Sequence, residues 1–134
     1  MQWLIIPLIA LLLVLAVMKF RVLRRARRQE DNVAPPLHEV LPEGVAAQPR
    51  MLLYFYSEHC APCRSVTPLI EELYHRRGEG VVKVDVRRHL MTARRFGIRT
   101  TPSLILVDRG RIAGIHTGSI SKATLQQFYD GRSA

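Results

Sequence analysis

The two cysteines are the residues of this chain best suited to chemistry. Cys60 and Cys63 are separated by two residues and are the only cysteines among 134 residues. Any thiol chemistry of the protein must therefore take place at this pair. A C-x-x-C pair is compatible with half of a zinc site, with an inert pair (a structural disulfide or two small buried residues) or with a redox-active dithiol.

The zinc site and the structural disulfide find little support in the sequence. A zinc site needs two further cysteines or a spaced histidine pair, and no two of the five histidines have the H-x₃₋₅-H spacing. A structural disulfide across so short a loop adds little stability, because the stabilisation grows with loop length. A redox pair needs one sulfur that is held as a thiolate.

The flanking residues give a physical reason for such a thiolate. The apolar run Met51–Tyr56 predicts a strand buried on both faces, and the apolar residues at positions 66, 69, 70 and 73 have helical spacing. Cys60 would then lie near a helix N-terminus, where free N–H groups and the helix dipole favour an anion. Pro62 is compatible with a first helical turn, and Cys63, one turn on, is expected to be more enclosed.

The rest of this region predicts alternating strands and helices. The first helix is expected to end near Arg77; further strands are expected at Val81–Val86, Ser103–Val107 and Arg111–Thr117, and further helices at His89–Phe96 and after Ser119 or Ser121. Asp108-Arg109-Gly110 predicts a hairpin turn. The order β-α-β-α-β-β-α predicts an α/β fold with a mixed central sheet flanked by helices.

An uncharged apolar segment precedes this domain. Trp3–Met18 contains sixteen residues without a charge, about 24 Å of helix against a hydrocarbon core of about 30 Å. Lys19 and Arg21 can snorkel, which extends the span to Leu23. We therefore predict a transmembrane anchor at residues 1–23, with lipid contacts over residues 3–23. A cleaved signal peptide is the alternative, but its basic residues should precede the apolar segment, whereas here they follow it.

The basic flank of this segment predicts its orientation. Five arginines lie between Arg21 and Arg28, and positive residues beside a span stay on the cytoplasmic side. We predict a single-pass protein of the inner (plasma) membrane with a cytoplasmic domain; the periplasmic side is the alternative. The net charge of +9 does not indicate a nucleic acid partner, because the basic run adjoins the apolar segment and lacks interleaved aromatic residues.

The chain is predicted to have three parts. After the anchor and its basic flank to about residue 28, residues 29–50 contain four prolines and a glycine. Such a composition predicts a linker. The domain itself is predicted to cover residues 51–134.

From Met51 to the C-terminus the sequence resembles the thioredoxin family. The resemblance rests on Phe55 and Glu58 before the C-x-P-C turn, Pro68 five residues after Cys63, KVDV from Lys83, FGIRTTPSLILVDRGR, and HTGSIS. It implies a thioredoxin-like fold and a thiol–disulfide oxidoreductase, which in the cytoplasm would act as a reductase. The partners implied are disulfide-containing proteins and a thioredoxin reductase.

The resemblance also implies a role for each site residue. Cys60 would attack a substrate disulfide and Cys63 would resolve the mixed disulfide, so that a Cys60–Cys63 disulfide forms; no other cofactor and no metal are implied. Pro102 would be a cis proline that faces the cysteines, and Thr101 would present its backbone to an extended substrate. A trans proline at the start of a strand is the alternative.

Three positions near the cysteines depart from the family pattern or lose a partner. His59 replaces a tryptophan; a cationic imidazole there would stabilise the Cys60 thiolate, whereas a merely exposed histidine would have no effect. Tyr54 replaces a buried aspartate that helps to deprotonate the resolving thiol, and a phenol with an unperturbed pKa near 10 is a poor base at neutral pH. In the family, a lysine at the position of Lys83 pairs with that buried aspartate. Here the aspartate is missing, and we predict that Lys83 pairs instead with Asp85, two residues further along the same strand face. Resolution by Cys63 is therefore expected to be slow.

A redox-inert binding module is the second function that the sequence allows. It would hold a partner in the groove beside Pro102 without using the thiols. The intact cysteine pair favours the oxidoreductase, because an adaptor does not need two thiols at this turn.

Overall fold

The structure is a computed structural model that describes residues 1–30 and 33–131. It divides into two units, Met1–Val33 and Ala34–Ala134, which are described separately. Residues 31–32 of the predicted linker and residues 132–134 of the predicted domain lie outside the described residues.

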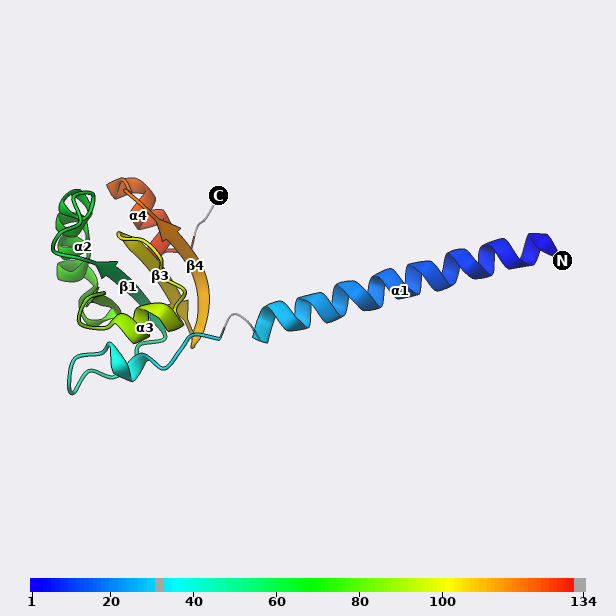
Figure 1. The fold of residues 1–134 in the computed structure, drawn as a ribbon, viewed down its shortest axis with the longest axis horizontal. Coiled ribbons are helices and arrows are strands. Elements are labelled where there is room, and N and C mark those ends of the chain that lie inside the picture. Colours follow the sequence, from blue (N-terminus) through cyan, green and yellow to red (C-terminus); the bar gives the residue numbers. More distant parts are fainter. Residues whose placement is uncertain (31–32, 132–134) are drawn as a thin grey trace. The chain divides into compact units, whose positions relative to one another are not determined.

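The first unit is the helix α1, Gln2–Glu30 (Figure 1). Its large apolar side chains described between Trp3 and Phe20 are all at least 50% exposed. Within the described residues, no helix combines the length and the apolar character that a membrane crossing requires. The predicted transmembrane anchor at residues 1–23 is therefore not supported by this finding.

The second unit is built on a four-stranded sheet with the order β2-β1-β3-β4. Its strands are β1 (Arg50–Tyr56), β2 (Val81–Asp85), β3 (Ser103–Asp108) and β4 (Arg111–Thr117), and its helices are α2 (Cys63–Arg77), α3 (Leu90–Arg95) and α4 (Lys122–Tyr129). β1 runs parallel to β2 and antiparallel to β3, which pairs antiparallel with β4. The predicted element order and the mixed sheet are confirmed.

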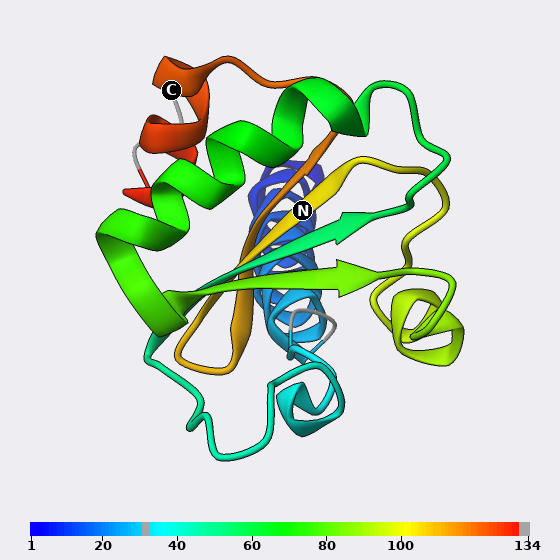
Figure 2. The ribbon, with the colours of Figure 1, turned by 90° about the vertical axis from the view of Figure 1, so that its left-hand side faces the viewer.

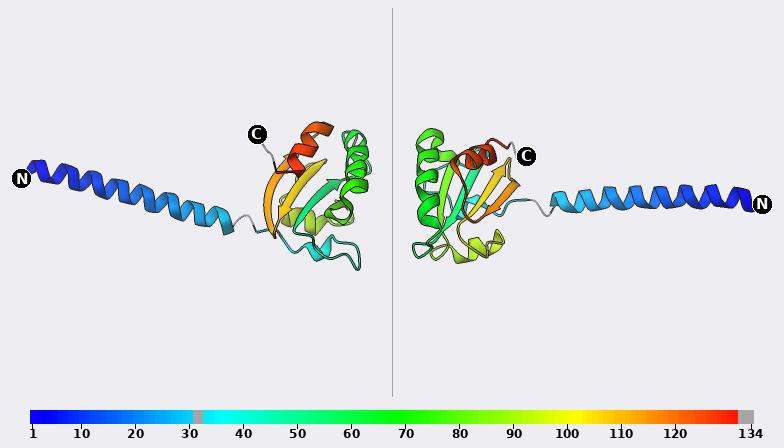
Figure 3. Two further views of the ribbon diagram at one scale, coloured as in Figure 1. Left: turned by 180° about the vertical axis from the view of Figure 1, so that it is seen from behind. Right: turned by 90° about the horizontal axis from the view of Figure 1, so that it is seen from above.

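The apolar run of β1 forms the centre of two hydrophobic layers. Residues 51–55 are all fully buried, and successive side chains of a strand point to opposite faces. Leu52 and Tyr54 pack with α2 and α4, whereas Leu53 and Phe55 pack on the other face with α3. Figures 2 and 3 show these helices around the sheet.

The turn between β3 and β4 has the backbone that a tight hairpin requires. Arg109 has φ 50° and Gly110 has φ 75°, and two successive positive φ values are the pattern of a type I′ turn, which fits the twist of paired strands. Asp108 pairs with Arg111 directly across this turn. The predicted hairpin is therefore present.

Residues 34–49 differ from the prediction of a linker. They belong to the second unit and include a short 3₁₀ helix at Leu37–Glu39. Val40 is buried in the layer that α3 covers. The Glu39 carboxylate accepts a 2.8 Å hydrogen bond from Thr92 of α3 and pairs with Arg95. The physical reason is that α3 is short and leaves part of this apolar face of the sheet uncovered. Residues 34–49 cover that part.

Candidate active site

The connection between β1 and α2 carries the two cysteines. β1 ends at Tyr56 and α2 begins at Cys63, and the Cys60 N–H donates to the Ser57 carbonyl at 3.1 Å, which closes a turn. Cys60 and Cys63 form a disulfide with a Cα–Cα distance of 5.3 Å. The strand-to-helix turn thus places the only two thiols of the sequence within bonding distance of one another.

The two sulfurs have different surroundings. Cys63 is only 3% exposed, whereas Cys60 is half-buried. The Cys63 N–H, at the start of α2, donates to the Cys60 sulfur at 3.3 Å. A helix N-terminus stabilises negative charge, so this contact favours a thiolate on Cys60 when the disulfide is open. Of the two, Cys60 is the sulfur that a substrate can reach.

A shallow depression of about 310 Å³ lies beside the disulfide. It is lined by residues of the turn and of the first part of α2, namely Tyr56, Ser57, Glu58, Cys60, Cys63, Arg64, Thr67 and Pro68. An opening next to the more exposed cysteine gives a substrate room to approach that sulfur.

A pair of hydroxyl groups lies next to Cys63. The phenol oxygen of Tyr54 is 2.9 Å from Thr67 Oγ1, and the phenol donates to the Cys63 carbonyl at 3.4 Å. Burial raises the pKa of Tyr54, and the hydrogen bond with Thr67 offsets this only in part. Tyr54 therefore stays neutral at physiological pH and cannot serve as a base toward Cys63.

Two supporting residues were predicted beside the cysteines. His59 directly precedes Cys60 and is exposed. Pro62 occupies the position before the first residue of α2 with φ −61°, the value to which a proline ring is restricted. Pro62 thus prepares the backbone for the helix that begins at Cys63.

Lys83 has a different partner from the one predicted. Its side chain forms an ion pair with Glu71 of α2 at 3.0 Å, whereas the Asp85 carboxylate accepts from the Arg87 N–H at 2.9 Å. The predicted pairing of Lys83 with Asp85 is therefore wrong. The reason is that α2 crosses the sheet face on which Lys83 lies and brings Glu71 closer.

Pro102 lies at the end of β3 that is next to the cysteine turn. The register pairs Ser103 with Phe55 near the end of β1, which places Pro102 beside the start of the turn. The Thr101–Pro102 peptide bond is cis, as the resemblance implied. Thr101 is half-buried and Pro102 is buried, and the Pro102 carbonyl accepts from the Gly118 N–H at 2.9 Å.

Sequence reasoning missed two residues of this region, Thr67 and Glu71. Thr67 follows Cys63 by four residues in α2, and residues with this spacing lie on the same face of a helix. This signal could have identified Thr67. Among the described residues, no three histidine, cysteine or acidic side chains lie close enough together to hold a metal ion.

Comparisons with known proteins agree with this geometry. The family model for thioredoxin matches residues 38–131. The chain is 31% identical over 80 residues to thioredoxin from Haemophilus influenzae, which covers 58% of this chain and 75% of that protein. It is 33% identical over 86 residues to thioredoxin C-2 from Corynebacterium nephridii, which covers 63% of this chain and 80% of that protein.

Solved structures show the same fold. A mutant thioredoxin from Halobacterium salinarum matches with a TM-score of 0.59 and 25% identity, over 65% of this chain and 77% of that one. Mitochondrial thioredoxin 3 from Saccharomyces cerevisiae, in its oxidised form, matches with a TM-score of 0.56 and 21% identity, over 62% and 78%. The predicted thioredoxin-like α/β fold is thereby confirmed for the second unit.

Proposed function

This chain belongs to the thioredoxin family and is a protein-disulfide oxidoreductase, and we propose that it reduces protein disulfides with Cys60 as nucleophile and Cys63 as resolving thiol. The observation that carries this assignment is the contrast between the two sulfurs. Cys60 is half-buried and its sulfur accepts a hydrogen bond from the N–H at the start of α2, whereas Cys63 is buried.

The proposed reaction has two exchange steps. The Cys60 thiolate attacks one sulfur of a substrate disulfide; the substrate S–S bond breaks and the other sulfur leaves as a thiolate, which takes up a proton. Cys63 then loses its proton and attacks the Cys60 sulfur, which releases the second substrate sulfur as a thiolate. Two electrons have passed to the substrate, and the Cys60–Cys63 disulfide remains.

A donor of two electrons must then reduce this disulfide again. Membership of the thioredoxin family suggests a thioredoxin reductase for that step. We propose disulfide-containing proteins as substrates, with no cofactor beyond the dithiol itself. An extended substrate segment would lie along the backbone of Thr101 and Pro102, because the strand register brings these residues beside the cysteine turn.

The residues around the pair would set the rates of the two steps. Pro62 positions the start of α2, and an imidazolium at His59 would strengthen the attraction for a thiolate on Cys60. Tyr54 stands where a base would help Cys63, and Lys83 is engaged by Glu71. We therefore propose that attack by Cys60 is fast and that resolution by Cys63 is slow.

Insulin reduction by the full chain with dithiothreitol tests the proposed activity. The wild type should accelerate precipitation of the insulin chains, and Cys60→Ser should abolish the acceleration. Cys63→Ser, reduced first and then freed of dithiothreitol before insulin is added, should instead accumulate a mixed disulfide with insulin that is visible on a non-reducing gel. If Cys60→Ser were as active as the wild type, or if Cys63→Ser trapped nothing, the assigned roles would be wrong; a redox-inert binding module would show no activity in any variant.

We also propose that α1 tethers this enzyme to the inner (plasma) membrane, with the second unit in the cytoplasm and contacts to lipid over residues 3–23. The support is the uncharged run Trp3–Met18 with its basic flank and the exposure of its apolar side chains. Exposed apolar area of this extent is unfavourable in water. In a cytoplasmic location the domain would act as a reductase.

Membrane fractionation and protease accessibility in intact spheroplasts test both the membrane tether and the side of the membrane on which the second unit lies. The full chain should sediment with membranes, resist carbonate extraction and be protected from added protease until the membrane is opened. Release by carbonate would refute the tether. Digestion in intact spheroplasts would place the domain in the periplasm, where oxidation or isomerisation of disulfides would be the expected direction.

A further inference from the structure

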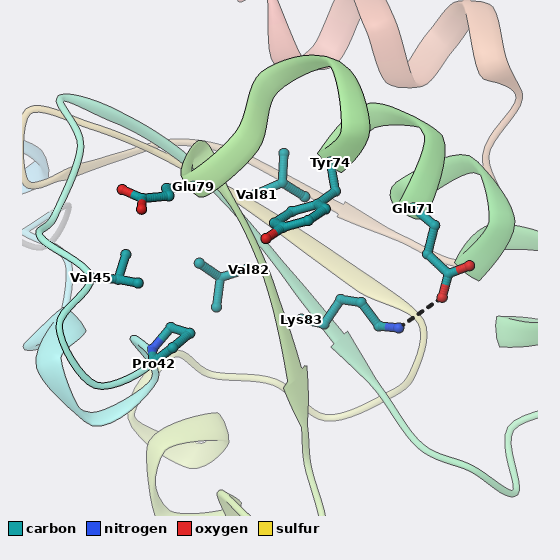
Figure 4. Close-up of a pocket in the computed structure, with 8 residues that line it drawn as sticks. All are labelled: Pro42, Val45, Glu71, Tyr74, Glu79, Val81, Val82 and Lys83. Atoms are coloured by element: carbon teal, nitrogen blue, oxygen red, sulfur yellow. Dashed lines mark hydrogen bonds and ion pairs between the residues drawn. The ribbon is translucent and has the colours of Figure 1, made fainter.

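A mainly apolar groove of about 370 Å³ lies away from the cysteines, along the outer edge of β2 (Figure 4). Glu71 and Tyr74 of α2 form one wall, and Pro42 and Val45 of the preceding loop form the other. Figure 4 shows β2 passing between these two walls. The remaining lining residues are Glu79, Val81, Val82 and Lys83.

The floor of this groove is an unpaired strand edge. In the part of the chain that the structure describes, β2 pairs with β1 on one side only, and the Val86 N–H donates to the Tyr56 carbonyl. Because backbone groups alternate in direction along a strand, the N–H and C=O of Lys83 point away from β1, into the groove. Within the described residues, no backbone hydrogen bond joins the loop at 42–48 to β2. The groove therefore offers backbone donors and acceptors to an extended chain.

The charges of the groove differ from those of the protein as a whole. The chain carries a net charge of +9, but the groove has two carboxylates and one ammonium group. Lys83 is paired with Glu71 at 3.0 Å, whereas Glu79 has no hydrogen bond or ion pair among the described residues. The groove is thus net negative, and the Glu79 carboxylate, which is unpaired among the described residues, favours a cationic ligand group.

We propose that this groove binds an extended peptide of a partner protein, which adds to the sheet as a strand beside β2. The open backbone of Lys83 selects an extended chain, the apolar walls select apolar side chains at alternate positions, and Glu79 selects a basic residue. This site would hold a partner whether the dithiol is oxidised or reduced, because it does not include the cysteines.

Fluorescence anisotropy with defined peptides tests this site on the full chain in non-ionic detergent. The probe is a fluorescein-labelled KVTVTVK amide, whose alternation suits an added strand; matched probes are EVTVTVE and a KVTVTVK methylated at alternate backbone nitrogens. We expect saturable binding of the basic probe, at least tenfold weaker binding of the acidic and methylated probes, and no change in Cys60→Ser.

Protein variants locate the binding. Lys83→Pro removes the N–H that faces the groove, and a proline is tolerated on an edge strand; it should weaken binding at least tenfold. Val45→Lys places a positive charge in the loop wall of the groove, where it repels the basic probe. Because Val45 lies outside the sheet, this variant should weaken binding even if Lys83→Pro perturbs the fold. Glu79→Gln should reduce the preference for the basic probe to less than threefold. Ala113→Pro, in the bulge of the other edge strand β4, is the matched control and should bind as the wild type does.

Several outcomes would overturn the proposal. One is the absence of saturable binding of the basic probe. Another is equal binding of the basic and the methylated probes, which would indicate an apolar cavity alone. A third is binding of the acidic probe that equals or exceeds that of the basic probe. Unchanged binding by Val45→Lys and Lys83→Pro would also overturn it. A dimer in sedimentation that Lys83→Pro dissociates would show that a second copy of the chain, and not a partner peptide, occupies the edge.

Discussion

Tyr54 and Thr67 join the central strand β1 to α2, the helix that begins at Cys63, with their hydroxyl oxygens 2.9 Å apart. Tyr54 is fully buried, and its phenol also donates to the Cys63 carbonyl. The position next to Cys63, the proposed resolving thiol, is thus occupied by hydroxyl groups and not by a carboxylate. This pair links the packing of the sheet to the proposed second exchange step.

Substitution of Tyr54 by aspartate should accelerate resolution. A carboxylate at this position can accept the Cys63 proton at neutral pH, and a positioned base contributes on the order of 10²-fold or more. We expect the mixed disulfide between Cys60 and a peptide substrate to decay roughly 10- to 100-fold faster in Tyr54→Asp than in the wild type. Rapid acid quenching at pH 7 measures the decay.

Tyr54→Asn is the matched control for this prediction. It has nearly the same size and polarity as the aspartate variant but cannot act as a base, so its decay should stay close to that of the wild type. Equal rates for the wild type and Tyr54→Asp would contradict the assignment of slow resolution to the missing base.

Stability at alkaline pH should depend on the same residue. Burial raises the pKa of Tyr54, so the folded protein retains this proton at a pH where the unfolded chain, with its pKa near 10, has lost it. The contribution of Tyr54 is fully present below pH 10 and is lost as the pH rises from there through the folded pKa. The free energy of unfolding should therefore fall by up to about 1.4 kcal/mol per pH unit in this window.

The difference between the wild type and Tyr54→Phe isolates this effect. Urea unfolding of the oxidised proteins, followed by near-ultraviolet circular dichroism, should give curves that converge as the pH rises above 10. At pH 7 the phenylalanine variant should be about 1 kcal/mol less stable, because it lacks the buried hydrogen bonds. A constant difference at every pH would show that Tyr54 ionises as easily in the folded protein as in the unfolded one.

The elements that sequence predicts well are those with strong local signals. The apolar run of β1, the hairpin residues Arg109 and Gly110, and the helix after Cys63 each depend on a few neighbouring residues. The C-x-x-C spacing identified the cysteine pair for the same reason. The last helix was expected after Ser119 or Ser121, and Ser121 is its N-cap, with a hydroxyl that accepts from the Thr124 N–H at 3.1 Å.

The features that the sequence did not predict depend on packing between distant elements. Lys83 pairs with Glu71 because α2 crosses above β2, and no local pattern encodes that crossing. Residues 34–49 pack on the face of α3 through Val40 and Glu39. Their prolines are typical of a linker, but prolines are also compatible with an extended segment that lies against a core.

Acid sensitivity should depend on Asp108. Arg50 and Asp108 are partners across β1 and β3, and their side chains are 2.6 Å apart. The hydrogen bond from Arg50, followed by its charge, lowers the pKa of Asp108 from its ordinary value of 3.8. A lowered pKa means that this stabilisation is present above the ordinary value and is lost as the pH falls through the folded value.

We therefore expect wild-type stability to decrease more steeply between pH 5 and pH 2 than that of Asp108→Asn, as measured by urea unfolding. Glu43→Gln, which changes an exposed carboxylate in the loop after Val40, should follow the wild-type curve. Parallel curves for Asp108→Asn and the wild type would show that the pair with Arg50 does not contribute to acid unfolding.

Gly114 should tolerate no larger residue while Phe128 is present. A Cβ at Gly114 would lie 2.9 Å from Phe128 Cε2 and 3.3 Å from Cζ, closer than carbon atoms approach without repulsion, so either the Phe128 ring or α4 itself would have to shift away from β4. Gly114→Ala should destabilise the protein by about 1–3 kcal/mol.

The double variant Gly114→Ala/Phe128→Leu should be more stable than Gly114→Ala alone, because the shorter side chain removes the clash. Ala113→Ser, at an exposed neighbour, should change stability by less than about 0.5 kcal/mol. Additive losses in the double variant would place the defect in the strand itself and not in its contact with the helix.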